Sequence, residues 1–220
     1  MPETPQAAVW SGPFGRSYTD RNDLTIEELD AMYESRYGVT RSALNARFLD
    51  GVDRGARILE VGTNVGTQLG CLRRQGFTRL YGIELQAYAV ARARSRLPGV
   101  TLIQGSATGL PFRDGSFDLV FTSGVLIHLA PADLATAMRE IHRCSRRGIL
   151  GLEYFAPELT GVPYRGRANL LWKADYAALY RAACPDLELV REERLPYRTE
   201  PLEDAMFLLR KRERGCASSP

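Results

Sequence analysis

One stretch of the chain decides its fold class: Ile58-Leu59-Glu60-Val61-Gly62-Thr63-Asn64-Val65-Gly66. Its first four residues have the length and character of a buried strand, and the glycines after them indicate a turn where backbone can approach a ligand closely. The turn departs from the G-x-G-x-x-G pattern, because Asn64 replaces the second glycine and Thr67 stands one residue after Gly66. A pyrophosphate site is therefore not favoured. Glu60 would repel a diphosphate and attract a cation or an ammonium group.

Strands and helices alternate on either side of this turn. The expected strands are Ile58–Val61, Leu80–Ile83, Val100–Ile103, Phe117–Phe121 and Gly148–Tyr154, and helices are expected through Leu69 and Leu72, over Tyr88–Leu97 and over Asp133–Cys144. Such alternation predicts an α/β fold in which helices cover both faces of a mostly parallel sheet. Two later apolar runs, Leu187–Val190 and Ala205–Leu209, predict a hairpin at one edge of the sheet.

The chain before residue 50 has a different pattern. Residues 1–23 carry glycine, proline and aromatic residues without a period, whereas Thr25-x-x-Glu28 is a capping box followed by helical spacing. A second helix is expected to begin near Thr40. We therefore divide the chain into an N-terminal lid with helices over residues 1–50, a core over 51–213 and a tail over 214–220.

Composition excludes several classes of protein. The 220 residues are 45% hydrophobic with a net charge of +3 and no long basic run, which argues against disorder and against nucleic-acid binding. Four cysteines without paired spacing predict reduced thiols, and two histidines make a His-rich metal site improbable, so no metal is expected. The start lacks a signal peptide and no apolar run approaches a membrane span, which predicts a soluble, cytoplasmic protein without a membrane partner.

Polar residues follow the ends of the expected strands, where open α/β sheets bind ligands. Glu84 ends the second strand, 18 residues after Gly66, and a carboxylate there can accept hydrogen bonds from both hydroxyls of a ribose. The third strand ends in Gln104-Gly105-Ser106-Ala107, and the fourth ends in a segment that carries His128. These positions predict one ligand site at the carboxyl edge of the sheet.

In their order and spacing, three motifs resemble those of a class I S-adenosylmethionine-dependent methyltransferase. They are LEVGTNVG at 59–66, YGIELQ at 81–86 and LPFRDGSFDLVFTSGVLIHLAP at 110–131. The resemblance implies a Rossmann-like fold with a seven-stranded sheet and one antiparallel edge strand. It also implies S-adenosylmethionine as cofactor and S-adenosylhomocysteine as product.

A closer resemblance covers nearly the whole chain. The pattern Trp10-Ser11-Gly12-Pro13-Phe14-Gly15-x-x-Tyr18-x-x-Arg21-Asn22, the string GVLIHLAP and the segment EYFAPELTGVPYRGRANLLWKADYA at 153–177 are similar to methylases associated with pseudaminic acid biosynthesis. That label comes from pathway association, so it points to a class of chemistry more than to a substrate.

The resemblance implies roles for individual residues. The implied cofactor-binding residues are Glu60, Gly62, Asn64, Gly66, Glu84, Leu85, Ser106, Ala107, Thr122, Ser123, Gly124, Trp10, Tyr18 and Arg21. Among them Glu60 is expected near the amino group, Glu84 at the ribose and Leu85 on the adenine. The alternatives are that Ser106 only caps the next turn, that Leu85 is core, and that the N-terminal aromatic residues form a fixed plug.

The expected catalytic residues are His128 and Tyr154. His128 is a candidate general base because imidazole titrates near neutrality; its alternative role is to bind backbone or cofactor at a helix start. The expected substrate-binding residues are Glu153, Tyr164, Arg165 and Arg167. Arginines in this loop could clamp an acidic group of the substrate, or could pair with Glu153, Glu158 or Asp175.

The sequence favours an enzyme that transfers a methyl group to an oxygen or nitrogen of a small polar metabolite, such as a sugar, an amino acid or a biosynthetic intermediate. Two other classes stay open: a cofactor-binding partner protein without catalysis and, less favoured, a nicotinamide-dependent oxidoreductase. The expected partner is a small-molecule substrate, and the oligomeric state is open.

Overall fold

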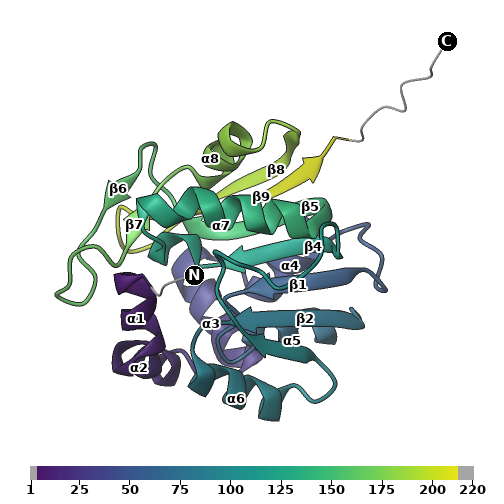
Figure 1. Ribbon diagram of the computed structural model, residues 1–220, viewed down its shortest axis with the longest axis horizontal. Helices are drawn as coiled ribbons and strands as arrows, with labels where there is room; N and C mark the ends of the chain where they lie inside the picture. The colour runs from purple at the N-terminus through teal and green to yellow at the C-terminus, as the bar shows by residue number, and fades with distance from the viewer. Residues whose placement is uncertain (1–3, 213–220) are drawn as a thin grey trace.

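The computed structural model describes residues 4–212, and its centre is a seven-stranded sheet (Figure 1). The predicted tail over 214–220 and Cys216 lie outside the described residues. The strands stand in the order β3-β2-β1-β4-β5-β9-β8. Their bounds are β1 Arg57–Val61, β2 Arg79–Glu84, β3 Thr101–Gln104, β4 Phe117–Ser123, β5 Ser145–Tyr154, β8 Leu187–Pro196 and β9 Glu203–Lys211.

All neighbouring strands from β3 to β5 pair in parallel, and β9 runs antiparallel to both β5 and β8. This confirms the predicted class, a mostly parallel sheet that ends in a hairpin. The antiparallel strand is β9, one place in from the edge, because β8 continues the sheet outside it. The register of the β5–β9 pair sets Tyr154 opposite Asp204.

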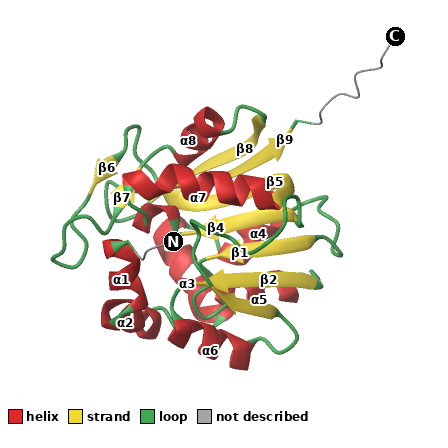
Figure 2. Cartoon of the chain, in the orientation of Figure 1, coloured by secondary structure: helices red, strands yellow, loops and turns green. Residues whose placement is uncertain are grey.

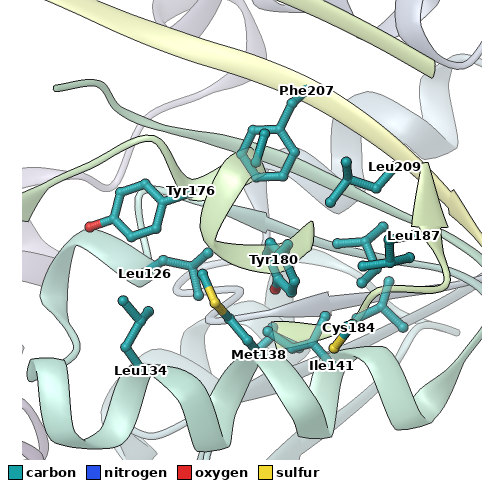
Figure 3. Packing of buried hydrophobic residues seen from close by; sticks show 14 of the residues in the cluster. Leu126, Leu134, Met138, Ile141, Tyr176, Tyr180, Cys184, Leu187, Phe207 and Leu209 are labelled. Carbon is teal, nitrogen blue, oxygen red and sulfur yellow. The ribbon is translucent and has the colours of Figure 1, made fainter. Parts of the chain in front are cut away.

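Helices cover both faces of the sheet, and each face has its own hydrophobic core. Adjacent strand residues point to opposite faces, so Ile58 packs in one core and Leu59 in the other. The helices are α3 Ile26–Tyr37, α4 Arg41–Phe48, α5 Thr67–Arg74, α6 Ala87–Arg96, α7 Pro131–Cys144 and α8 Tyr176–Ala183. Figure 3 shows Met138 and Ile141 of α7 packed close to Tyr180 of α8.

Two short helices precede the predicted capping box. They are α1 Pro5–Ser11 and α2 Pro13–Arg21, each with proline in its first turn, and α1 is capped by the Thr4 side chain. The sequence had shown no period here, because the helices have seven and nine residues and Gly12 separates them. The two later predictions are confirmed: Thr25 and Glu28 form a capping box on α3, and Thr40 caps α4.

The parallel strands end on the side of the molecule where α1 and α2 lie (Figure 2). A small two-stranded sheet, β6 Thr160–Gly161 with β7 Trp172–Lys173, lies on the same side, beyond the end of β5. Three cysteines of the described part, Cys71, Cys144 and Cys184, are buried and free. None of the helices within residues 4–212 is long and apolar enough to cross a membrane.

Candidate functional site

A cavity of about 680 Å³ lies at the carboxyl ends of the parallel strands, within the usual size range of a small-molecule site. Two walls enclose it. We call one the turn wall: it is formed by the turns after β1 to β4, at residues 60–65, 84–86, 105–109 and 123–125. We call the other the aromatic wall, and its residues are Trp10, Tyr18, Tyr33, Arg36, Tyr37, His128, Tyr154, Tyr164 and Asp204.

The turn after β1 has a shape that few residues can adopt. Gly62, Asn64 and Gly66 all have left-handed backbone, with φ of 75°, 47° and 82°. A Cβ on Gly62 would lie 2.5 Å from Val125 Cγ2. Asn64 replaces a glycine here at small cost, because asparagine tolerates this conformation better than most side chains. Gly66 is the N-cap of α5 and, unlike Gly62 and Asn64, does not line the cavity.

Glu60 is a buried carboxylate on the turn wall, with 2% of its surface exposed. Its Oε2 accepts a hydrogen bond of 2.7 Å from the Thr63 hydroxyl. Burial raises the pKa of Glu60 to about 8, although the Thr63 hydrogen bond and the charge of Arg41 oppose that rise. Arg41 is itself buried, and its guanidinium donates to Asn45, Tyr33 and Ser123. Glu60 is therefore suited to a cationic ligand group, whose charge would offset the cost of ionising it.

Glu84 fixes the turn wall from the end of β2. Its Oε2 accepts the Asn64 backbone N–H at 2.9 Å, and its Oε1 accepts the Gln86 backbone N–H at 2.8 Å. Burial raises the pKa of Glu84, while these backbone hydrogen bonds lower it. A carboxylate offers about four acceptor positions, so roughly two stay available for ligand hydroxyls. Glu84 thus holds the β1 turn in place and presents acceptor positions to the cavity.

Beyond β3, Ser106 caps its own turn. Its Oγ accepts the Thr108 backbone N–H at 3.2 Å and pairs with the Thr108 hydroxyl at 2.9 Å. This is the arrangement of the capping alternative, yet Ser106, Ala107 and Thr108 all line the cavity, as does Leu85. At the end of β4, Ser123 and Gly124 line it too, whereas Thr122 is buried beneath the wall.

Glu153 lies outside the cavity and supports the turn that carries His128. It is 1% exposed, and its two carboxylate oxygens accept the backbone N–H groups of Val125 and Ile127 at 3.2 and 3.3 Å. Burial raises the pKa of Glu153 to about 7. These contacts hold the turn Leu126–His128 (η1) at the cavity. The structure therefore does not bring Glu153 into contact range of a substrate in the cavity.

His128 lines the cavity with a defined tautomer. Its Nδ1 lies 2.8 Å from the Leu170 carbonyl oxygen. Because that oxygen can only accept, Nδ1 carries the hydrogen and Nε2 is left as an acceptor. Burial lowers the pKa of His128 to about 4. The imidazole is thus neutral near pH 7 and is a weaker proton acceptor than an exposed histidine.

Trp10 is the centre of the aromatic wall. Its ring centroid lies 4.3 Å from that of His128, 5.2 Å from those of Phe14 and Tyr18, and 6.4 Å from that of Tyr164. The edge-to-face geometry with Phe14 and Tyr18 is the favourable one for aromatic pairs. The N-terminal helices thus cover the cavity with a packed aromatic cluster.

Gln86 fastens this cover to the turn wall. Its side-chain amide donates to the carbonyl oxygens of Trp10, Ser11 and Gly12 at 3.2, 2.8 and 3.0 Å, where α1 ends. A second attachment joins the region of α2 to α6, where Tyr88 donates to Asp20 and both Arg92 and Arg96 pair with Asp23. Gln86 is the last residue of the YGIELQ motif, but the sequence analysis assigned no role to its side chain.

The three arginines expected at the site do not line the cavity. Arg21, Arg165 and Arg167 are all exposed, and the Arg167 guanidinium lies over the Phe14 ring at 5.3 Å. The alternative ion pairs are also not formed: among residues 4–212, neither Arg165 nor Arg167 pairs with Glu153, Glu158 or Asp175. An arginine that sequence reasoning missed, Arg36 on α3, lines the cavity instead.

Asp204 and Tyr37 are further residues that the sequence did not reveal. Asp204 directly precedes the second of the late apolar runs and is the second residue of β9, and Tyr37 ends α3. Both line the cavity beside Arg36 and Tyr154. A buried acid at a strand start carries no local signal, since only the β5–β9 register brings it to the site. In the described part of the chain, no three His, Cys, Asp or Glu side chains are grouped to hold a metal ion.

Comparison with known sequences finds methyltransferases that are similar to part of this chain. Residues 59–150 match the methyltransferase domain family. An uncharacterized methyltransferase of Synechocystis sp. is 33% identical over 97 residues, which are 44% of this chain and 45% of that protein. A demethylmenaquinone methyltransferase of Beutenbergia cavernae is 31% identical over 133 residues, 60% of this chain and 50% of that protein. The chain spans about half the length of these curated relatives.

Solved structures share the fold over most of the chain. The 1,6-didemethyltoxoflavin-N1-methyltransferase of Burkholderia thailandensis, solved with 1,6-didemethyltoxoflavin and S-adenosylhomocysteine, has a TM-score of 0.74 at 21% identity, covering 97% of this chain and 92% of that one. The [4+2]-cyclase SpnF has a TM-score of 0.66 at 18% identity and covers 86% and 96%. The predicted Rossmann-like methyltransferase fold is confirmed.

Proposed function

We propose that this chain is a class I S-adenosylmethionine-dependent methyltransferase that acts on an oxygen or nitrogen of a small polar metabolite. One observation carries the proposal: Glu60 and Glu84, at the ends of adjacent parallel strands, line the same cavity within a methyltransferase domain. The fold alone would not carry it, because one fold hosts many reactions and a [4+2]-cyclase shares this one.

The carboxylates of the turn wall fit S-adenosylmethionine, which carries an ammonium, a sulfonium and two ribose hydroxyls. Glu60 would hold the ammonium, and the free acceptor positions of Glu84 would hold the ribose hydroxyls. Leu85 and Ala107 offer apolar surface for the adenine. A nicotinamide dinucleotide fits this wall poorly, because Glu60 would face a diphosphate in a turn without the second glycine.

When bound, the cofactor supplies a methyl group attached to a positively charged sulfur. The residues of this chain have three tasks in such a reaction: to position the acceptor, to exclude water and to accept a proton where the acceptor carries one. The rings of Trp10, Phe14 and Tyr18 pack together on the side of the cavity that α1 and α2 cover, which suits the second task. His128 is suited to orient the acceptor through Nε2, and its low pKa disfavours the general-base role expected from the sequence.

Two features support a small acceptor. The cavity is covered by α1 and α2, which are fastened to its rim by Gln86. The aromatic wall combines phenol hydroxyls with Arg36 and Asp204, which suits a polar molecule more than a hydrocarbon chain. The N-terminal pattern from Trp10 to Asn22 and the segment at 153–177 support a place near the methylases associated with pseudaminic acid biosynthesis.

A methyl-transfer screen tests the proposal. Purified protein is incubated with S-adenosylmethionine and a panel of sugars, amino sugars, amino acids and aromatic metabolites, and S-adenosylhomocysteine is measured by mass spectrometry. We expect product with at least one acceptor and none without acceptor. Tight binding of the cofactor with no turnover on any acceptor would favour the non-catalytic partner instead. Quenching of the protein's tryptophan fluorescence on addition of NADH would favour the oxidoreductase.

A further inference from the structure

Asp204 is a buried carboxylate that faces the cavity from the aromatic wall. It is 2% exposed and lies at the start of β9, opposite Tyr154 at the carboxyl end of β5. Both residues line the cavity. Asp204 thus comes from a different part of the sheet than the two carboxylates of the turn wall, which end β1 and β2.

Two tyrosines hold the Asp204 carboxylate in a fixed orientation. The Tyr37 hydroxyl donates to Oδ2 at 2.5 Å, and the Tyr197 hydroxyl donates to Oδ1 at 3.1 Å. About two of its four acceptor positions are therefore still open. Among the ion pairs of residues 4–212, none includes Asp204, so no cation within the described chain neutralises it at contact distance. Such a carboxylate is ready to accept a hydrogen bond from a ligand.

The groups around Asp204 come from four further parts of the structure. Arg36 and Tyr37 belong to α3, Tyr154 to β5, Lys173 to β7 and Tyr197 to the loop after β8. Burial raises the pKa of Asp204 to about 6, while its two tyrosine donors and the charges of Arg36 and Lys173 oppose the rise. Near pH 7 the carboxyl is mostly ionised and can take up a proton without a large cost.

Glu153 provides an internal comparison. Both of its oxygens are used by backbone N–H groups of the η1 turn, and it does not line the cavity. Asp204 is equally buried but is bonded only to side chains and faces the cavity. One buried acid thus supports a turn, and the other has acceptor capacity left for a ligand.

We propose that Asp204 is the acceptor-binding carboxylate, which recognises a hydroxyl or an amino group on the methyl acceptor and takes the proton that this group loses. The inference rests on the proposed function. In the transfer, the acceptor oxygen or nitrogen forms a bond to the methyl carbon, the carbon–sulfur bond breaks with its electron pair going to sulfur, and the proton goes to Asp204. A carboxylate acceptor is disfavoured, because two like charges would meet in a buried site.

Three small probes of similar size test this assignment: ethanolamine, ethylene glycol and glycolate. Each is titrated into the protein saturated with S-adenosylhomocysteine, and the carboxyl carbon resonance of Asp204 is followed by NMR. We expect ethanolamine to shift this resonance and to bind at least about tenfold more tightly than glycolate at pH 7. The variant Asp204→Asn should lose that preference. Asp186 is an exposed acid that pairs with His142, and the control variant Asp186→Asn should keep the preference for ethanolamine.

The outcomes separate this inference from the proposed function. If wild-type protein does not bind S-adenosylhomocysteine, the proposed function fails. If it binds and ethanolamine causes no shift, shows no preference over glycolate, or keeps its preference in Asp204→Asn, the Asp204 assignment alone is overturned. Should Asp204→Asn not fold, the wild-type titration at pH 5 gives the test: the preference must fall as the carboxyl is protonated, and an unchanged preference overturns the assignment.

Discussion

The two walls of the cavity are built in different ways. The turn wall is fixed by the backbone: Glu84 accepts the N–H groups of Asn64 and Gln86, and three left-handed residues set the shape of the β1 turn. The aromatic wall consists of side chains from α1, α2, α3, η1, β5, the loop between β6 and β7, and β9. Replacing one side chain directly alters the shape of the second wall, whereas the shape of the first depends mainly on the backbone at the strand ends.

This difference assigns a task to each wall. Fixed backbone and two carboxylates suit a ligand that is always the same, which is the cofactor in the function proposed above. A wall of side chains from distant segments suits the partner that differs between enzymes, which is the acceptor. We therefore expect changes to the turn wall to reduce cofactor binding. Changes to the aromatic wall should alter which methyl acceptor is used, or how α1 and α2 cover the cavity.

The largest expected effect is at Glu84 on the turn wall. Glu84→Ala removes the acceptors for the ligand hydroxyls and for the Asn64 and Gln86 N–H groups. We expect the affinity for S-adenosylhomocysteine to fall at least about 100-fold, measured by calorimetry. Glu34→Ala, at an exposed position of α3, is the control. Equal affinity in the two variants would mean that Glu84 does not bind the ligand.

The second prediction concerns the neutral His128 of the aromatic wall. The unfolded chain takes up a proton at this histidine near pH 6.5, but the folded chain does so only near a pKa of about 4. Protonation therefore favours unfolding as the pH falls through this window, and wild-type stability should drop relative to His128→Asn, which keeps a donor near the Leu170 carbonyl. We expect the difference in unfolding free energy to change by about 2 kcal/mol between pH 7 and 4.5.

Denaturant unfolding at several pH values measures this change. His142→Gln removes the other histidine, which pairs with Asp186 outside the cavity, and serves as control. Parallel pH curves for wild type and His128→Asn would contradict a His128 that stays neutral in the folded chain.

A third prediction tests the contact between the β1 turn and the turn that carries His128. Gly62→Ala places a Cβ 2.5 Å from Val125 Cγ2 and forces alanine into left-handed backbone. We expect a loss of stability of about 1–2 kcal/mol from the backbone alone, with the steric clash in addition. In Gly62→Ala/Val125→Ala the clash is removed and only the backbone cost stays. Additive effects in this double-mutant cycle would show that the two turns do not press on each other.

The smallest expected effect is at Gln86, which joins the two walls. Gln86→Ala frees the end of α1 and also removes the side-chain oxygen that accepts the Tyr88 N–H at the start of α6. We expect S-adenosylhomocysteine to dissociate about tenfold faster, as measured by surface plasmon resonance. Gln75→Ala, which removes a similar amide bond to the Ser42 carbonyl away from the cavity, is the control. Unchanged dissociation in Gln86→Ala would mean that α1 is not part of the cover.

The turn wall could be predicted from the sequence because its residues follow strands in local motifs. Glu60, Glu84 and Ser123 were expected at the strand ends, and the structure brings all three to one cavity. The capping box at Thr25 was predictable for the same reason, since its partners are three residues apart. Local sequence thus carries the fold and the wall that the fold determines directly.

The aromatic wall could be predicted only in part. Trp10, Tyr18 and Tyr164 were expected at the site and line it, but Arg36, Tyr37 and Asp204 were not foreseen. Their juxtaposition depends on the packing of α3 against the sheet and on the register of β9 with β5. Neither leaves a pattern in the sequence that can be read locally.

The arginines illustrate the same limit. Arg92 and Arg96 lie on α6, and both pair with Asp23, which attaches the N-terminal segment to this helix. Arg143 on α7 donates hydrogen bonds to Glu140, Asp114 and two backbone carbonyls. The partners of these arginines lie far away in the sequence, except for Glu140, so their roles emerge only from the fold.

The central claim is that the turn wall binds S-adenosylmethionine, and a calorimetric titration of wild-type protein with S-adenosylhomocysteine tests it most directly. The product carries the same ammonium and ribose hydroxyls but no reactive methyl group, so binding is measured without turnover. We expect one site per chain, a dissociation constant in the micromolar range or below, and no competition by NADH. Absence of binding at high micromolar concentration, or displacement by NADH, would contradict it.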